Sequence, residues 1–251
     1  MRSVVLFFVA LMFVVSCADD TPTAQEIVDA SIESAGGTFR TNKMINFKFR
    51  DKFYKSIIKS DGTFHYERSF KDSIYHYRDI LSNQGLKSYI NDSMVTLPDS
   101  MASRYSASVN SVHYFAQLPY GLNAPAVNKK KLANETINGI EYYKVEVTFN
   151  QDGGGEDFED VFIYWIDTKS NNVDFLAYSY NEDDGLGLRF REAYNERYIN
   201  NIRFVDYNNF KPKDESAKLT DLALLFQSDG LQLLSKIETE NVIVNQLVDN
   251  N

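Results

Sequence analysis

Cys17 is the only cysteine in the 251-residue chain, so its thiol is the side chain best placed for covalent chemistry. It follows Arg2, an apolar run at residues 4–15 and the small residue Ser16. A basic start, a short apolar core and a small residue before the cut are the parts of a secretory signal peptide. The run is also shorter than the roughly 20 residues that span a bilayer. The sequence therefore predicts that residues 1–16 are removed and that Cys17 is available for modification.

Other chemistry is weakly supported. The histidines are His65, His76 and His113, and no zinc-protease, nucleophile-elbow or phosphate-loop motif contains them or stands elsewhere in the chain. The glycine-rich acidic stretch at residues 152–160 lacks the ligand spacing of a calcium-binding loop. We expect no catalytic residue, no metal site and no cofactor, and we interpret His113 as a structural residue of a helix.

Three charged residues share a strand face with apolar neighbours if each strand alternates with a period of two. Arg68 falls on the side of Phe64 and Tyr66, Glu192 on the side of Phe190, and Asp206 on the side of Phe204. Burying a charge is costly unless the charge is paired. One hypothesis is that the three charges meet inside an apolar cavity; the alternative is that they lie at strand ends, where alternation no longer implies burial.

The elements that must position these side chains are mainly strands. Thr23 and Glu26 form a capping-box pattern, which predicts a helix from residue 24 to the Gly36-Gly37 stop. Apolar residues at helical spacing predict a second helix over residues 100–117. Asp61-Gly62 and Asn138-Gly139 predict hairpin turns. Residues 219–226 fit a helix or a strand, and residues 231–248 predict one closing strand.

The bulk composition restricts the function classes. The net charge of −9 argues against nucleic acid and against electrostatic adhesion to anionic lipid. Aromatic residues make up 14% of the chain, which suits half-buried strands or a binding cavity equally. The length favours one domain. We divide the chain into a signal peptide at 1–16, a tether at 17–23 and a single domain at 24–251.

Residues 14–17, Val-Val-Ser-Cys, resemble the bacterial lipobox, which implies acyl chains on Cys17. The alternative is a secreted protein with one free thiol. Asp19-Asp20 resembles a surface-export signal, but a polar tether is expected in any case. The stretches at residues 113–115, 118–122, 164–167, 190–194 and 203–207 resemble an uncharacterised envelope-lipoprotein family of the Bacteroidota, over about residues 25–245. The layout also resembles the LolA/LolB-like lipoprotein-carrier fold, which implies a curved sheet around a hydrophobic cavity.

Together these observations predict a mainly β, α+β fold: a curved antiparallel half-barrel sheet with helices covering its concave face. The expected function is a non-enzymatic lipoprotein, anchored in the cell envelope and most simply in the outer membrane, that binds an acyl chain or another hydrophobic molecule. A structural or interaction lipoprotein with a filled core, and a glycan-acting enzyme, stay open as alternatives. The candidate ligand-binding residues are Phe47, Phe49, Phe64, Tyr66, Arg68, Phe190, Glu192, Phe204 and Asp206.

Overall fold

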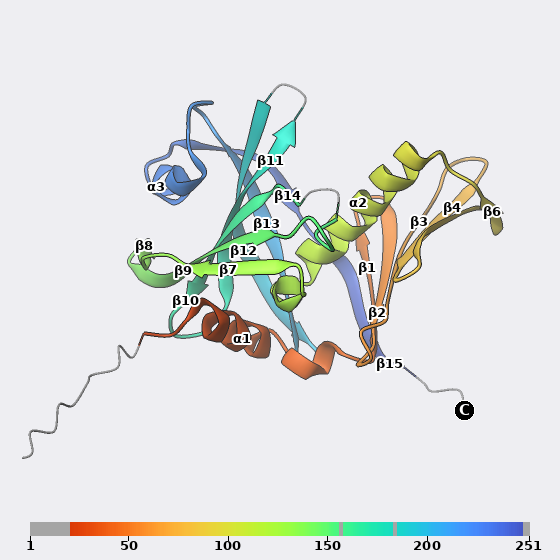
Figure 1. The fold of residues 1–251 in the computed structure, drawn as a ribbon, viewed down its shortest axis with the longest axis horizontal. Coiled ribbons are helices and arrows are strands. Elements are labelled where there is room, and N and C mark those ends of the chain that lie inside the picture. Colours follow the sequence, from red (N-terminus) through yellow and green to blue (C-terminus); the bar gives the residue numbers. More distant parts are fainter. Residues whose placement is uncertain (1–20, 156–157, 183–184, 248–251) are drawn as a thin grey trace, which may run out of the picture.

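The computed structural model describes residues 21–155, 158–182 and 185–247. Two open, curved antiparallel sheets face each other across helix α2, with α1 at one end and α3 on the outside of the larger sheet (Figure 1). This arrangement confirms the predicted mainly β class with curved antiparallel sheets. The signal peptide, Cys17 and the first part of the tether lie outside the described residues.

The smaller sheet has seven strands in the order β15-β1-β2-β3-β4-β5-β6. Its first hairpins follow the chain, and the β2–β3 turn contains Gly62 at a φ of 82°, as the Asp61-Gly62 pair predicts. The strands are β1 (Lys43–Phe49), β2 (Lys52–Ile58), β3 (Phe64–Lys71), β4 (His76–Ser82), β5 (Gly85–Ile90), β6 (Ser93–Val95) and β15 (Glu240–Gln246).

The larger sheet has eight strands in the order β14-β13-β12-β11-β10-β9-β7, and β8 also pairs with β9. Asn138 and Gly139 both have positive φ, at 49° and 82°, which is the backbone of the tight hairpin turn predicted there. The strands are β7 (Val127–Lys131), β8 (Glu135–Ile137), β9 (Ile140–Phe149), β10 (Val161–Asp167), β11 (Val173–Glu182), β12 (Gly185–Ile199), β13 (Ile202–Pro212) and β14 (Leu231–Ile237).

The C-terminal segment connects the two sheets, so the single closing strand predicted over residues 231–248 is wrong. The segment pairs with β13 as β14, breaks at Glu238 and Thr239, and pairs with β1 as β15. Asp206 fixes the break, because its Oδ1 accepts hydrogen bonds from the Thr239 backbone N at 2.9 Å and from Arg197 Nη2 at 3.1 Å. A hydrogen bond from the Thr239 backbone to the Asp206 side chain does not affect the apolar pattern of residues 231–248, so that pattern cannot predict the break.

The helices follow the local sequence signals. α1 (Ala24–Ser34) has the predicted capping box between Thr23 and Glu26. α2 (Asp99–Ala116) matches the helix expected over 100–117 within one residue at each end. Residues 219–226, which fit either structure, form a 3₁₀ turn followed by α3 (Leu222–Gln227). No helix in the described part of the chain is long and apolar enough to cross a bilayer.

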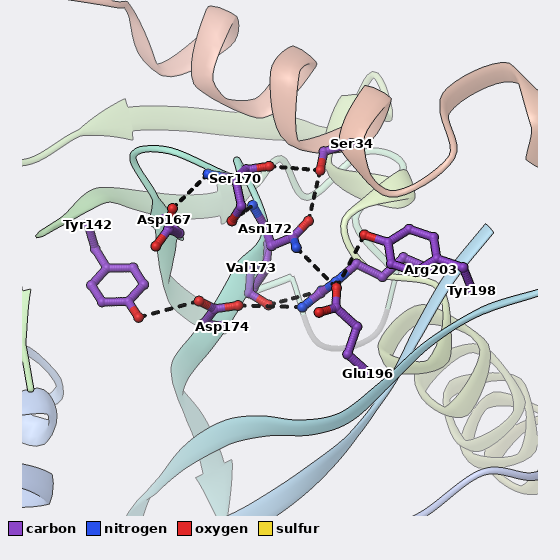
Figure 2. Close-up of polar contacts among 10 residues, drawn as sticks. All are labelled: Ser34, Tyr142, Asp167, Ser170, Asn172, Val173, Asp174, Glu196, Tyr198 and Arg203. Atoms are coloured by element: carbon purple, nitrogen blue, oxygen red, sulfur yellow. Dashed lines mark hydrogen bonds and ion pairs between the residues drawn. The ribbon is translucent and has the colours of Figure 1, made fainter. Parts of the chain in front are cut away.

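A polar network fastens the C-terminal end of α1 to the larger sheet (Figure 2). Ser34 Oγ donates to Asn172 Oδ1 at 2.8 Å, and Asn172 Nδ2 donates to Glu196 at 3.1 Å. Glu196 in turn accepts from Arg203 Nε at 2.6 Å, and Arg203 also donates to the Val173 carbonyl at 3.1 Å. The network therefore ties α1 to β11, β12 and β13.

The larger sheet is buried on both faces. On the inner face, turned toward α1 and α2, one apolar cluster contains Val145, Phe162, Tyr164, Leu176 and Tyr207. On the outer face a second cluster packs under α3 and contains Ile163, Trp165, Phe175, Phe190 and Leu222. Apolar residues consequently occur at consecutive positions, and alternation alone cannot tell the inner face from the outer one.

Candidate functional site

A cavity of about 860 Å³ lies between α2 and the inner face of the larger sheet. This volume is within the range of about 300–1,000 Å³ that is typical of small-molecule sites. Its apolar lining comes from α2 and from strands of both sheets and includes Phe49, Val112, Phe115, Phe149, Phe162 and Val205.

Helix α2 forms one wall of the cavity because it contacts both sheets. Tyr114 is hydrogen-bonded to the Tyr164 hydroxyl at 2.6 Å, and Phe115 packs against Phe162 with ring centroids 6.2 Å apart. On the other side, the His113 ring stacks on Tyr66 at 4.5 Å between ring centroids. Buried aromatic contacts on both sides therefore hold α2 over the concave surface.

Arg191 of β12 is the most unusual side chain of this lining. It is only 7% exposed, and its guanidinium carbon lies 3.7 Å from the centre of the Phe115 ring. Nη2 donates to the Tyr178 hydroxyl at 2.8 Å, whereas Nε and Nη1 are buried without a hydrogen-bond partner. Burial lowers the pKa of Arg191 from its ordinary value, although the side chain stays protonated in this range.

Arg191 belongs to a polar row that crosses the inner face. It is paired in register with Asn209 of β13, and Asn209 is paired in register with Ser235 of β14. All three residues line the cavity. Asn209 Nδ2 donates to Ser235 Oγ at 3.3 Å, while Asn209 Oδ1 is buried without a partner. An apolar cavity with a few placed polar groups is the usual construction of a ligand site.

Acidic residues line another part of the cavity, directly before β10. Glu159 accepts a hydrogen bond from Asn181 Nδ2 at 2.9 Å, and Asp160 lies beside it in the lining. Within the described ranges, no three His, Cys, Asp or Glu side chains are grouped closely enough to hold a metal ion. The cavity can therefore hold an apolar molecule between α2 and the larger sheet, and Arg191 offers a cation to a polar group on that molecule.

The structure does not bring Arg68, Glu192 and Asp206 together, so the predicted meeting of the three charges is wrong. Arg68 pairs with Asp79 at 2.7 Å in the smaller sheet, and Asp206 pairs with Arg197 at 3.1 Å where the sheets join. Glu192 is half-buried and accepts from Asn208 Nδ2 at 2.9 Å. Arg68 and Asp206 are buried and paired with charged residues of the neighbouring strands, an arrangement that neither the cavity hypothesis nor the strand-end alternative included.

The aromatic candidates are divided between different regions. Phe49 lines the cavity, Phe47 and Tyr66 pack around His113, and Phe64 packs on Tyr66 with ring centroids 4.9 Å apart. Phe204 belongs to the cluster that joins the two sheets, with Ile45, Phe47 and Tyr54 among its members. Phe190 lies on the outer face under α3 and not in the cavity.

Sequence reasoning missed the residues that give the cavity its polarity and much of its wall. Alternation assigns Phe190 and Glu192 to the concave side and so excludes Arg191, whereas the structure places Arg191 there. For Phe115 and Tyr178, the only indication of a cavity was the high aromatic content of the whole chain.

Solved structures are similar to this chain at low sequence identity. A LolA superfamily protein from Nitrosomonas europaea is 15% identical, with 91% of this chain and 96% of that chain covered and a TM-score of 0.49. A DUF1329 family protein from Desulfovibrio piger is 12% identical, with 92% and 96% covered and a TM-score of 0.51. A domain described as outer membrane lipoprotein-sorting, from Vibrio parahaemolyticus, is 10% identical, with 90% and 94% covered and a TM-score of 0.47.

The sequence comparisons give a family but no activity. The model of a "Family of unknown function (DUF6503)" matches residues 3–239. No protein of curated function matches the chain by sequence.

Proposed function

The chain belongs to this DUF6503 family of unknown function, and we propose that it is a non-enzymatic envelope lipoprotein that binds an acyl chain or another hydrophobic molecule between α2 and the larger sheet. The observation that carries this proposal is the cavity of about 860 Å³ with its aromatic and aliphatic lining. The space is partly open to solvent, so its lining is a concave apolar surface and not a packing void. Concave, mostly apolar surfaces of this size are where small molecules usually bind.

The driving force for binding is removal of apolar surface from water. Each Å² of apolar surface buried contributes about 25 cal/mol, offset by the cost of ordering the ligand. Phe162 and Tyr178 stack at 5.1 Å between ring centroids and form a flat, rigid part of the lining. Such rings give a flexible chain a large contact area and lose little conformational freedom themselves.

Attachment to the membrane is the second part of the proposal. Cys17, preceded by Val14, Val15 and Ser16, would carry the lipid after removal of residues 1–16. Each buried methylene of an acyl chain contributes about 0.8 kcal/mol to membrane binding. We place the protein in the cell envelope, with the outer membrane of a Bacteroidota cell as the proposed site, facing either the periplasm or the surface.

The second candidate is an interaction lipoprotein without a ligand. Exposed apolar residues such as Ile74, Met94 and Leu186 favour it, because they could contact a partner. They are spread over both sheets, however, whereas the cavity is one continuous space that strands and α2 enclose together. The ligand-binding proposal therefore accounts for more of the observed construction.

Native mass spectrometry tests the proposal. All described helices and strands lie between residues 24 and 246, so a chain beginning at residue 18 contains the whole described fold without the acylated cysteine. This chain is purified without detergent from the host that makes it. A co-purifying mass that extracts into organic solvent is the expected result and identifies the ligand class. An empty protein that also fails to take up a fluorescent fatty acid would favour the interaction lipoprotein.

A further inference from the structure

We infer that Arg191 holds the anionic head group of an amphipathic ligand, a single-chain lipid with a carboxylate or a phosphate, whose tail lies against the aromatic lining. The inference rests on the proposed function and narrows it from any hydrophobic molecule to an anionic one. Two observations carry it: Arg191 lines the cavity, and two of its three guanidinium nitrogens have no hydrogen-bond partner.

The first step is the free-energy cost of burying the Arg191 guanidinium without an anionic partner. A buried cation without a counter-ion is expensive, so proteins pair or neutralise such groups. Arginine cannot escape by losing its proton near neutral pH. Within the described ranges no carboxylate lies within ion-pair distance of Arg191, and its one hydrogen-bond partner is the neutral Tyr178 hydroxyl. An anion in the cavity would supply the missing partner once the side chain turns its buried Nε and Nη1 toward the cavity.

The second step is a comparison with the other buried arginines. Arg68 has Asp79 at 2.7 Å, and Arg203 has Glu196 at 2.6 Å with Asp174 at 3.4 Å. These two arginines are satisfied by carboxylates of the fold itself. Arg40 has Gln117 as its partner at 3.2 Å and packs near Phe204, but it does not line the cavity. Arg191 alone among these four combines missing partners with a position in the cavity wall.

The third step is the shape of the site around the guanidinium. Phe115 covers one of its faces, which fixes the plane of the group and leaves its edge as the donor side. Neighbouring Asn209 and Ser235 continue the polar row and add polar atoms for a head group or its bound water. Charge-assisted hydrogen bonds from arginine to carboxylate or phosphate are about twice as strong as neutral ones.

The direction of the ligand follows from the charges of the lining. Glu159 and Asp160 lie directly before β10 and make that part of the lining acidic. Arg50, the other cation of the lining, is exposed, whereas buried Arg191 belongs to the polar row across β12, β13 and β14. The anionic head is therefore expected at the row, and the apolar tail against Phe149, Phe162 and the α2 side chains.

Binding of three ligands to the chain from residue 18 tests the inference: palmitate, lysophosphatidic acid with a palmitoyl chain, and uncharged methyl palmitate. Each displaces a fluorescent acyl probe from the wild type, from Arg191→Met and from Arg104→Met. Methionine keeps an apolar side chain on Phe115 and removes only the charge and the donors. Arg104 is an exposed arginine of α2 outside the cavity lining and serves as the matched control.

We expect Arg191→Met to weaken binding of at least one anionic ligand about tenfold or more, with methyl palmitate within about twofold of wild type and Arg104→Met unchanged. Loss for palmitate alone, or for lysophosphatidic acid alone, identifies the head group. Equal weakening of methyl palmitate would make Arg191 a structural residue and overturn the inference.

Two other outcomes separate this inference from the proposed function. Unchanged binding of all three ligands to Arg191→Met overturns the inference and leaves the hydrophobic cavity standing. Failure of the wild type to bind any of the three overturns both. If Arg191→Met does not fold by circular dichroism, Arg191→Lys provides the second test, because it keeps the charge and loses the planar donors; intermediate affinity for the anions is then expected.

Discussion

Arg191 of β12 and Asn209 of β13 are paired in register on the inner face of the larger sheet, and both have buried polar atoms without partners. Such atoms are rare in folded proteins, because each costs about 1–3 kcal/mol relative to a satisfied one. Both residues line the same cavity, and these particular atoms are buried behind its surface. A bound anion would complete the hydrogen bonds of the Arg191 donors, whereas Asn209 Oδ1 is an acceptor and needs a donor such as a hydroxyl group or a water molecule.

The ligand-free protein should be limited in stability by Arg191. Replacing it with methionine removes a buried, unpaired charge, so we expect the free energy of unfolding to rise by about 1 kcal/mol even though the contact with Phe115 changes. Urea denaturation of delipidated wild type and Arg191→Met measures the difference. Arg104→Met should change the value by less than about 0.5 kcal/mol. A clear loss of stability in Arg191→Met would mean that the guanidinium stabilises the empty fold.

Replacing Arg68 with methionine should lower the free energy of unfolding, in contrast to Arg191→Met. Its guanidinium donates to Asp79 at 2.7 Å and to Ser108 Oγ of α2 at 2.8 Å, so Arg68→Met leaves a buried carboxylate without its cation. We expect a loss of about 3–5 kcal/mol in the free energy of unfolding. The double variant Arg68→Met/Asp79→Leu should recover most of it, because no unpaired charge is left. A loss below about 1 kcal/mol in the single variant would contradict this role.

His113 should make the fold sensitive to acid. Burial lowers its pKa to about 3, against about 6.5 in the unfolded chain. Between these values the unfolded state binds more protons, so stability falls as the pH falls, by about 1.4 kcal/mol per pH unit. In His113→Phe this contribution is absent. Urea midpoints at pH 6.0 and 4.5 should therefore differ less in the variant than in wild type; equal differences would contradict the low pKa.

Cys17 should carry the membrane anchor. Metabolic labelling with an alkyne fatty acid is expected to mark wild type and not Cys17→Ala, because no other cysteine can receive the lipid. The wild-type protein should sediment with membranes. Ser3→Ala, a change in the N-terminal segment away from the lipobox, serves as the control and should keep both properties. Labelling of Cys17→Ala to the wild-type level would contradict the lipoprotein interpretation.

Local signals predicted much of the fold. The Thr23–Glu26 capping box gave the start of α1, and the Asn138-Gly139 pair gave its hairpin, because each depends on residues close in sequence. The closing segment could not be predicted, because Asp206 breaks it at Thr239 through a contact between residues 33 positions apart. Contacts of that kind depend on the folded arrangement.

The sequence predicts an apolar site lined by aromatic residues, but it does not identify most of the residues that line it. Alternation assigns Phe49 to the concave side of the smaller sheet, and the structure has Phe49 in the lining of the cavity. In β12 the same rule chose Phe190, since nothing local reveals that α3 covers that face while Arg191 faces α2. Because β12 has charged residues on both faces, Arg191 on one and Glu192 on the other, its inward residues become known only when the neighbouring helices are placed.

Titration of a fluorescent acyl probe into three forms of the chain from residue 18 tests the central claim most directly. Ala107→Trp fills the cavity from α2, and Ser100→Trp adds the same ring at an exposed position of the same helix outside the cavity lining. We predict saturable binding, one probe per chain, to the wild type and to Ser100→Trp, with affinity at least tenfold weaker in Ala107→Trp. Equal binding to all three forms, or none to the wild type, would contradict a ligand site between α2 and the larger sheet.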